Sequence, residues 1–361
     1  MRIAIVGASG NVGTALLRRL AAEPDVDEVV GVARRPPGED AGAPYDRATW
    51  LACDIGEPDA VATLTDAFRG ADAVVHLGWQ IQPSHDRARL RRTNVTGSGH
   101  VARAVVAAGV PALVYASSVG TYAPAPKDMF VDETWPATGI PGSDYSQDKA
   151  AVETMLDEVE RDQPGLRLVR LRPALIFQRD AGAAITRYFV GPLVPVTLLR
   201  PHRLRLVPRA PGLRVQCVHA DDIADAYLRA VLGDVRGAFN VAADPVLSPE
   251  LIAERFGGRT VPAPTGLLRG AARASWLARL QPTEPGWVTM AENAPLMDCT
   301  RIASELGWRP ASDAVAALRD LLDGIGAGAG TASPALRPSD PLRRRVRHLL
   351  GAKPSGHGTR Y

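Results

Sequence analysis

The chain has 361 residues, of which 46% are hydrophobic, and a formal net charge of +3, so it is long enough to bury a large core. A disulfide-stabilised scaffold and a cysteine metal site are excluded, because the cysteines are odd in number, far apart and without metal-ligand spacing: Cys53, Cys217 and Cys299. We therefore expect reduced thiols, no bound metal and a cytoplasmic location. No charged leader precedes the first apolar run, so we expect no secretory signal.

The first twenty residues predict a strand, a tight turn and a helix. An apolar run over residues 1–6 is followed by Gly7, Gly10 and Gly13 and then by a helical pattern. Gly7 would let the chain turn, Gly10 would let the backbone approach a diphosphate, and Gly13 would let the helix pack on the sheet. The first gap is one residue longer than in the usual dinucleotide fingerprint, so a plain glycine turn is the alternative interpretation.

Four further apolar runs follow, and helical patterns separate most of them. They cover residues 29–33, 49–53, 73–77 and 112–116. Near-continuous apolar strands that alternate with helices predict a parallel sheet covered on both faces. The expected fold is therefore α/β, a doubly wound parallel sheet of the Rossmann type with a smaller C-terminal substrate lobe. Ligands bind such sheets beyond the carboxyl ends of the strands.

Tyr145 and Lys149 follow these strands at helical spacing. Residues i and i+4 share one helix face, so the Lys149 ammonium can lie beside the Tyr145 phenol. A phenol titrates near pH 10, and a nearby cation favours the phenolate, so the pair could exchange a proton with a substrate hydroxyl. Such spacing also arises by chance on helix surfaces. Behind a glycine-rich nucleotide loop it indicates redox chemistry.

Several motifs, in order along the chain, resemble those of the extended short-chain dehydrogenase/reductases, the NAD-dependent epimerase/dehydratase family. The resemblance covers roughly residues 1–323. Besides the glycine loop and the Tyr145–Lys149 pair, it rests on segments 53–55, 76–79, 93–98, 115–122, 171–177, 218–226, 239–241 and 306–310. Each motif alone is weak, but their shared order makes coincidence remote.

The resemblance implies roles for individual residues. Tyr145 would be the general acid/base, Lys149 would lower its pKa and hold the nicotinamide ribose, and Ser118 would bind the reacting oxygen. Ser118 is preferred to its neighbour Ser117 because it precedes Tyr122 by four residues, and the alternative for Ser118 is a cap or turn role. The expected cofactor-binding residues are Gly7, Ser9, Gly10, Asn11, Val12, Gly13, Arg34, Arg35, Asp54, Ile55, Leu77, Gly78, Asn94, Tyr145, Lys149 and Pro173.

Within this set, Asp54 is expected at the adenine, and Asn94 could serve only to tie a helix to a strand.

The choice of cofactor depends on the end of the second strand, where an acidic residue would accept the ribose hydroxyls of NAD. Arg34 and Arg35 stand there instead and could bind a 2′-phosphate, so NADP is preferred over NAD. Solvated loop charges are the alternative interpretation of these arginines.

The substrate is defined less sharply. The apolar segment from Tyr188 to Leu199 is too short and too interrupted to span a bilayer. It would either line a substrate pocket that suits a hydrophobic alcohol or ketone, or belong to the hydrophobic core. Residues 79–82 would face the same cleft. Arg214 lies one position away from the arginine that grips the diphosphate in nucleotide-sugar epimerases of the family. A nucleotide sugar is therefore an alternative substrate.

The expected domain plan is a body over residues 1–323 and a basic tail over 324–361. Within the body, the nucleotide-binding core would comprise about 1–175 with segments near 215–245, and the substrate lobe about 176–214 and 246–323. Residues 325–361 carry seven Lys/Arg and one acid, and their Gly/Ala/Pro-rich start predicts disorder. A short basic helix over 342–350 is less favoured than a solvated tail.

The expected activity is that of an NAD(P)-dependent oxidoreductase or epimerase at a secondary alcohol or carbonyl, acting on a small-molecule substrate. Nothing in the sequence predicts a specific nucleic-acid partner, and the family resemblance implies a possible homodimer. A cofactor-binding sensor or scaffold without catalysis is the alternative from another class. The complete set of Ser118, Tyr145 and Lys149 argues against it.

Overall fold

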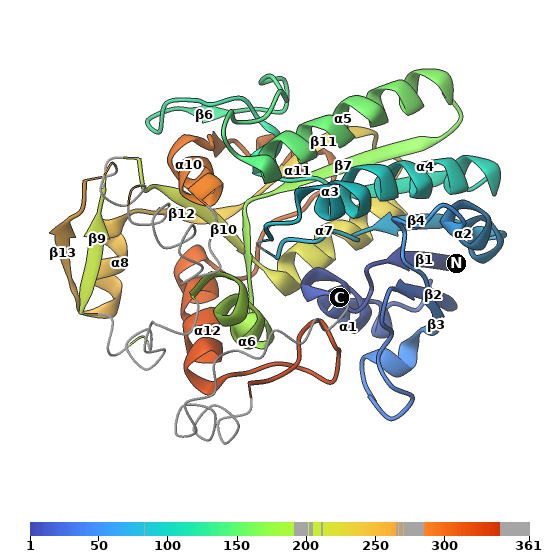
Figure 1. The fold of residues 1–361 in the computed structure, drawn as a ribbon, viewed down its shortest axis with the longest axis horizontal. Helices are drawn as coiled ribbons and strands as arrows, with labels where there is room; N and C mark the ends of the chain where they lie inside the picture. The colour runs from blue at the N-terminus through green and yellow to red at the C-terminus, as the bar shows by residue number, and fades with distance from the viewer. Residues whose placement is uncertain are drawn as a thin grey trace.

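The computed structural model describes residues 1–82, 84–190, 201, 205–210, 212–264, 266, 270 and 285–339 (Figure 1). Its centre is a seven-stranded sheet in the order β11-β7-β5-β4-β1-β2-β3, in which every neighbouring pair is parallel. The strands are β1 (Arg2–Val6), β2 (Glu28–Ala33), β3 (Thr49–Ala52), β4 (Ala73–His76), β5 (Ala112–Ala116), β7 (Arg167–Pro173) and β11 (Gly237–Val241). The expected doubly wound α/β fold is confirmed.

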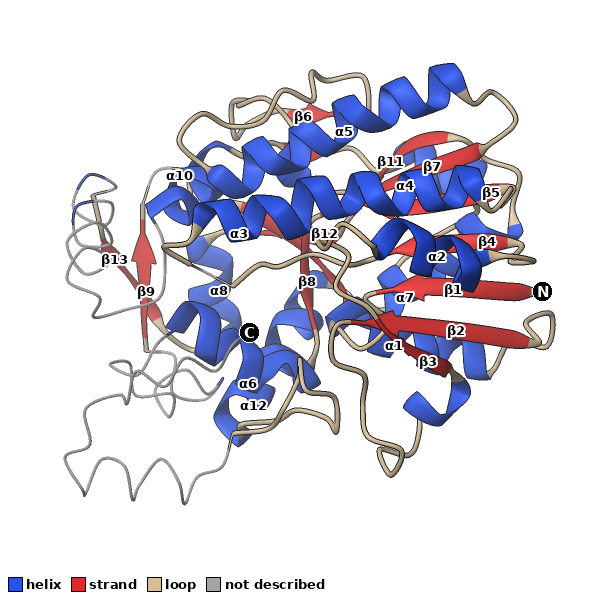
Figure 2. Cartoon of the chain, turned by 45° about the vertical axis from the view of Figure 1, so that its right-hand side comes forward, coloured by secondary structure: helices blue, strands red, loops and turns tan. Residues whose placement is uncertain are grey.

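Both faces of this sheet carry apolar side chains, because consecutive strand residues are mostly apolar and successive side chains point to opposite faces. In β1, Ile3 and Ile5 join the core on one face, whereas Ala4 and Val6 join the core on the other. The first face is covered by α1 (Asn11–Ala21) and α7 (Ala220–Leu232). The second is covered by α2 (Ala60–Phe68), α4 (Gly97–Ala107) and α5 (Asp144–Asp162) (Figure 2).

Helix α5 carries the predicted proton-transfer pair. The hydroxyl of Ser143 caps the helix by accepting a hydrogen bond from the Ser146 amide. Tyr145, Lys149 and Glu153 follow at intervals of four residues and share one face. Lys149 and Glu153 are buried, at 3% and 1% exposure, because this face is turned towards β5 and β7.

A smaller lobe stands beside the carboxyl ends of the main strands. It contains three small sheets: β8 (Leu175–Phe177) with β10 (Val215–His219) and β12 (Ala243–Leu247), β9 (Leu206–Arg209) with β13 (Arg259–Pro262), and β6 (Phe130–Val131) with β14 (Leu296–Met297). The remaining helices are α3 (Arg87–Arg91), α6 (Gly182–Ile185), α8 (Pro249–Phe256), α10 (Pro285–Asn293), α11 (Thr300–Glu305) and α12 (Ala314–Ala327). Of the segments near 215–245, α7 and β11 join the nucleotide-binding core, whereas β10 pairs in the small sheet.

The expectation of a disordered tail from residue 324 is wrong for residues 324–339. Helix α12 continues to Ala327, and Gly328 ends it in the left-handed conformation, with φ +64°. Beyond it, Ser333 is fully buried and Leu336 is 3% exposed. Composition concealed this order, because the contacts that produce it are made with the N-terminal part of the chain. Residues 340–361, with the predicted basic helix over 342–350, lie outside the described residues.

Two other expectations concern the chain as a whole. The cysteines are free thiols, as expected. Among the described residues, no helix is both long and apolar enough to cross a membrane. Of the apolar segment between Tyr188 and Leu199, the part from residue 191 onwards lies outside the described residues.

Candidate active site

The glycine loop between β1 and α1 has one open side. Gly7 turns with φ +86°, and a Cβ there would lie 2.8 Å from the Gly78 nitrogen. At Gly13 a Cβ would lie 2.5 Å from the Ala8 carbonyl oxygen, so this glycine lets the helix pack closely on the loop. At Gly10, by contrast, the nearest atom is the Gly7 carbonyl at 3.3 Å. The first amides of α1 lack intrahelical acceptors and favour an anion, so the loop fits the diphosphate of a nucleotide.

A pocket extends from this loop across the ends of β1, β2 and β4. Nine of the predicted cofactor residues line it: Gly7, Ser9, Gly10, Arg34, Arg35, Asp54, Ile55, Leu77 and Gly78. Burial lowers the pKa of Arg34, while the charge of Asp54 acts in the opposite direction. The pocket therefore holds two guanidinium groups and one carboxylate at the end of β2 and β3.

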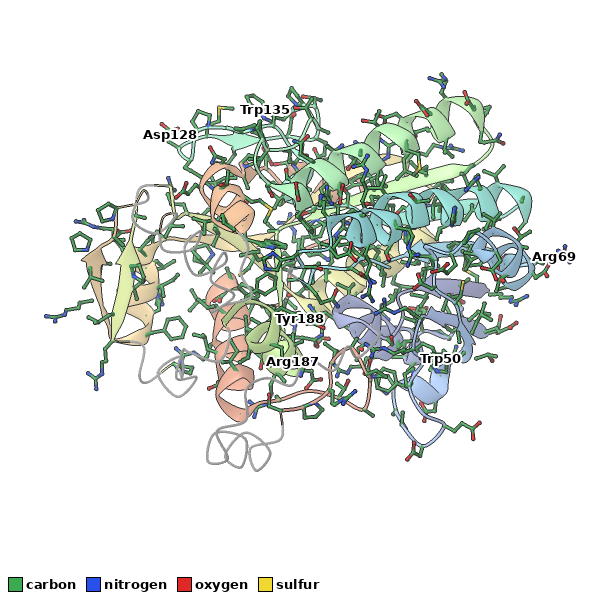
Figure 3. All side chains as sticks on the ribbon, in the orientation of Figure 1. Trp50, Arg69, Asp128, Trp135, Arg187 and Tyr188 are labelled. Atoms are coloured by element: carbon green, nitrogen blue, oxygen red, sulfur yellow. The ribbon has the colours of Figure 1, made fainter. Side chains whose placement is uncertain are left out.

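Other segments complete the wall of this pocket. Residues 79–82 were expected to face the substrate cleft, but Trp79, Gln80 and Gln82 line this glycine-loop pocket. The wall also includes Tyr188, which is labelled beside α6 in Figure 3. The indole nitrogen of Trp79 is buried and has no hydrogen-bond partner within the described part of the chain. Such an orphaned donor is available to a ligand.

Several predicted cofactor residues do not line the pocket. The side chain of Asn11 bonds to that of Gln178 at 2.6 Å, and Val12 packs against the core. The amide of Asn94 binds both backbone groups of Gln80, at 2.7 and 3.0 Å, which is the structural tie considered for it. Pro173 is a buried residue of β7. The backbone of α1's first turn still faces the loop, but these side chains are engaged elsewhere.

Tyr145 lies next to the pocket, among aromatic rings. Its ring is T-shaped to Trp79, with centroids 5.9 Å apart, and tilted on Trp287 at 4.7 Å. A Cβ at Gly120 would lie 2.9 Å from the Tyr145 ring and 3.3 Å from the Ser118 hydroxyl, so only glycine fits there. Burial raises the pKa of Tyr145 to about 12, and a hydrogen bond with Ser118 acts to lower it. The phenol is therefore protonated at neutral pH.

The expected lowering of the Tyr145 pKa by Lys149 is wrong for this structure. The Lys149 ammonium donates to the Ala116 carbonyl at 2.6 Å and lies 3.6 Å from the centroid of the Trp79 ring. A longer hydrogen bond of 3.4 Å runs to the Tyr115 hydroxyl. Burial lowers the pKa of Lys149 to about 7, against the opposing charge of Glu153. The ammonium thus has other partners, and it is only partly charged at neutral pH.

The two serines at the end of β5 have different partners. The Ser117 hydroxyl donates to the buried carboxylate of Glu153. The Ser118 hydroxyl accepts from the Gly120 amide at 3.0 Å, which caps the 3-10 turn Val119–Thr121, and it also reaches Tyr145. The cap role and the proximity to the phenol therefore coexist in Ser118. Ser117 is bound to a structural network instead.

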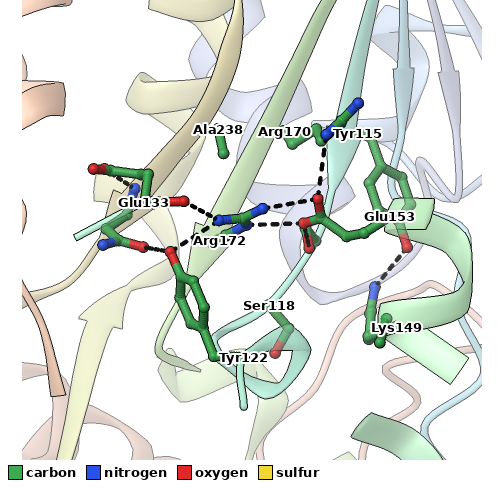
Figure 4. A network of polar contacts seen from close by, with 12 residues as sticks. Tyr115, Ser118, Tyr122, Glu133, Lys149, Glu153, Arg170, Arg172 and Ala238 are labelled. Carbon is green, nitrogen blue, oxygen red and sulfur yellow. Dashed lines mark hydrogen bonds and ion pairs between the residues drawn. The ribbon is translucent and has the colours of Figure 1, made fainter. Parts of the chain in front are cut away.

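That network lies behind the candidate site and joins α5 to β7 (Figure 4). Arg172 donates from Nε and Nη2 to the two carboxylate oxygens of Glu153, each at 2.9 Å. Its remaining nitrogen donates to the Tyr122 hydroxyl at 3.0 Å, and Arg170 lies 3.5 Å from the same carboxylate. Burial acts to raise the pKa of Glu153, but hydrogen bonds and charge from Arg172 outweigh burial and hold it below its usual value.

An apolar cavity of about 120 Å³ adjoins the aromatic rings. Its wall is mainly apolar and includes Val119, Trp287 and Met290, and a Cβ at Gly120 would contact both Tyr145 and Met290. Lys127 and Arg214 also line it. The cavity is therefore next to the Tyr145 phenol and has two cations in its wall.

Sequence reasoning missed Trp287 and Glu153. Trp287 belongs to α10, far along the chain from Tyr145, and nothing in its local sequence marks it. Glu153 could have been found, because it continues the Tyr145–Lys149 spacing by one further helical turn.

A family model described as "NAD dependent epimerase/dehydratase family" matches residues 3–242. An uncharacterized protein of Mycobacterium tuberculosis (strain ATCC 25618 / H37Rv) is 30% identical over 322 residues, which are 89% of this chain but 29% of that protein. The chain thus spans less than a third of that relative's length. L-arabinose 1-dehydrogenase (NAD(P)(+)) of Haloferax volcanii is 30% identical over 191 residues, 50% of this chain and 68% of that protein.

Among solved structures, the UDP-glucose 4-epimerase of Thermus thermophilus in complex with NAD aligns with a TM-score of 0.65. The alignment covers 90% of this chain and 99% of that chain at 21% identity. At this identity the likeness shows a shared fold.

Proposed function

Because the chain belongs to the NAD dependent epimerase/dehydratase family, we propose that it is an NAD(P)-dependent oxidoreductase that reduces a ketone to a secondary alcohol. One observation carries the proposal: Trp79 lies in the wall of the glycine-loop pocket and also contacts Tyr145 and Lys149. A nucleotide in that pocket would therefore have its reactive end beside a buried phenol.

The state of the phenol supports the reductive direction. When bound, NAD(P)H supplies a hydride from C4 of its nicotinamide. As the ketone is reduced, negative charge would develop on its oxygen, and Tyr145 would donate the proton to that oxygen. With a pKa raised to about 12, Tyr145 is protonated before the reaction, as a general acid must be. Ser118 would hold the carbonyl oxygen, and Lys149 would bind the nicotinamide ribose.

We propose NADP as the preferred cofactor. Arg34 and Arg35 line the pocket at the end of β2, where the adenosine ribose lies in this fold. Guanidinium groups bind phosphate through paired hydrogen bonds, whereas the ribose hydroxyls of NAD call for an acidic acceptor at the same place. Asp54 follows β3 and would remain near the adenine.

The proposed substrate is an apolar ketone. The cavity of about 120 Å³ beside Tyr145 is similar in size to cavities of roughly 150 Å³ that bind benzene. Trp287 forms part of its wall and packs on Phe189 with ring centroids 5.0 Å apart. Apolar and aromatic walls favour an apolar ring-sized group.

A nucleotide sugar is the second candidate, favoured by one observation. Lys127 and Arg214 lie together in the cavity wall and hydrogen-bond to each other's backbone carbonyls, at 3.1 and 2.8 Å. Burial lowers the pKa of Lys127 to about 8, and Arg214 contributes to this shift. A substrate phosphate placed here would favour the charged form of Lys127 and could also bind the Arg214 guanidinium.

The experiment compares Tyr145→Phe with Tyr227→Phe. Tyr227 is a matched control, because its hydroxyl is buried and has no hydrogen-bond partner among the described residues. Turnover is followed by nicotinamide absorbance with apolar ketones and with nucleotide sugars, and cofactor affinity by calorimetry. Tyr145→Phe is expected to bind cofactor normally and to lose about 10²–10⁴-fold in kcat. Unchanged turnover in Tyr145→Phe would refute the assignment of Tyr145 as the acid. An unmodified chain that binds cofactor but turns over none of these substrates would instead favour a non-catalytic cofactor sensor.

A further inference from the structure

Residues 328–339, here called the strap, follow α12 and return to the nucleotide-binding half of the molecule. In Figure 1 the strap is the red segment that runs from the end of α12 towards α1. Its first residue, Gly328, bonds through its carbonyl to the Ser339 amide at 3.0 Å, which closes the base of the segment. The strap is therefore a defined loop with both ends held together.

The strap is bound directly to the glycine loop. The Ser333 hydroxyl, fully buried, donates to the Ser9 carbonyl at 2.6 Å. A second link runs from Thr331 to the Tyr45 hydroxyl at 2.6 Å and on to Thr14 of α1 at 3.1 Å. Both contacts reach the segment that binds the diphosphate in this fold.

Its other side is bound to the smaller lobe. Arg187 donates to the carbonyls of Arg337 and Ala335, at 2.6 and 3.3 Å. The Ala183 amide in α6 donates to the Ala329 carbonyl at 2.9 Å. The strap thus bridges the two halves of the molecule at the pocket, and its middle residues, Pro334 and Ala335, form part of the pocket wall.

We infer that the strap is part of the cofactor-binding site, where it fixes the glycine loop and encloses the bound nucleotide. The inference rests on the proposal that NAD(P) occupies this pocket. Ser333 holds the Ser9 peptide, which lies between Gly7 and Gly10, in the conformation seen here. Pro334 and Ala335 form the pocket wall on the side of the strap, so they would contact a nucleotide bound there and slow its release. The segment therefore sets both the affinity and the residence time of the cofactor.

Two pairs of variants in the full-length chain test this inference. Ser333→Ala removes the bond to the glycine loop, and Ser339→Ala, elsewhere in the strap, is its control. Ala335→Asp places a negative charge in the pocket wall, and the same substitution at Ala107, an exposed residue of α4 that does not line the pocket, is its control. Dissociation constants for NADP and NAD are measured by calorimetry, and the release rate of the reduced cofactor by stopped-flow fluorescence. Circular dichroism checks that each variant is folded.

Ser333→Ala is expected to weaken cofactor binding by about 3–10-fold and to speed its release, as the loss of one buried hydrogen bond does. Ala335→Asp is expected to weaken binding at least about tenfold, with a loss that shrinks at high salt. Ser339→Ala and Ala107→Asp should stay within about twofold of the unmodified chain.

Unchanged affinity and release in both Ser333→Ala and Ala335→Asp would overturn the inference, as would equal losses in Ser333→Ala and Ser339→Ala. If the unmodified chain bound neither NADP nor NAD, the proposed function would be overturned instead. The two failures are thus separable in one set of titrations.

Discussion

Replacing Arg172 with methionine would remove the cation that neutralises Glu153 in the network behind the candidate site. The Arg172 and Glu153 side chains are 6% and 1% exposed, and two hydrogen bonds of 2.9 Å join them. After the change, Glu153 keeps the Ser117 hydroxyl and the more distant Arg170, at 3.5 Å. A buried carboxylate would then be left with much weaker compensation.

The magnitude follows from the burial of the pair. Breaking a buried ion pair by removing one partner costs about 3–5 kcal/mol, because an uncompensated charge stays in the protein. The remaining cation, Arg170, reduces this cost, so we expect a loss of about 2–4 kcal/mol at pH 7 for Arg172→Met.

The loss should depend on pH in a defined direction. In the unmodified chain the pKa of Glu153 is held below its usual value of 4.5, so its stabilising effect is present above pH 4.5 and is lost as the pH falls through the lower native pKa. In Arg172→Met, burial raises the pKa of Glu153 instead, so the carboxylate destabilises the fold increasingly as the pH rises above 4.5. The difference between the two proteins is therefore larger at pH 7 than at pH 4.5.

Urea denaturation at both pH values measures this difference. The double variant Glu153→Gln with Arg172→Met removes the unpaired charge and is expected to recover most of the loss at pH 7. A cost below about 1 kcal/mol for Arg172→Met at pH 7, or a double variant no more stable than the single one, would refute the reasoning.

Two further predictions concern the candidate site. Burial lowers the pKa of Lys149 to about 7, so the unmodified chain gains stability as the pH rises from about 7 to 10.5. Lys149→Met should lack this gain. In urea denaturation we expect this variant to be about 1–3 kcal/mol more stable than the unmodified chain at pH 7, with a smaller difference at pH 10. A methionine variant that is less stable at pH 7 would contradict this. Replacing Arg34 and Arg35 with glutamine should weaken NADP binding at least about tenfold in calorimetry and leave NAD binding little changed. Equal losses for both cofactors would argue against a 2′-phosphate contact.

The nucleotide-binding half could be predicted from sequence because its signals are local. The first five strands of the main sheet, β1 to β5, are short apolar runs. Gly7 turns with a positive φ, as its place after the first strand implied, and Gly13 lets helix and loop approach. Arg34 was named because it follows the second strand, where the adenosine ribose lies in this fold, whereas Asp54 was named from the family resemblance; both line the pocket.

The rest depends on contacts between distant segments, which local patterns do not encode. Trp287 reaches Tyr145 from a helix in the smaller lobe, and Ser333 reaches the glycine loop from a segment whose composition indicated disorder. The partners of Lys149 were mispredicted for a related reason. Helical spacing placed its ammonium near the phenol, but Trp79 and the Ala116 carbonyl compete for it, and the sequence does not show which contact prevails.

The hydrogen bond from Ser333 to Ser9 joins residues that are 324 positions apart. Ribosomes add about 5–20 residues per second, so on the order of tens of seconds separates the synthesis of these two serines. During that interval the nascent chain can form its first strand and helix, but not the finished nucleotide pocket. Cofactor capture is therefore expected to be a late event in biogenesis, after translation has passed the strap.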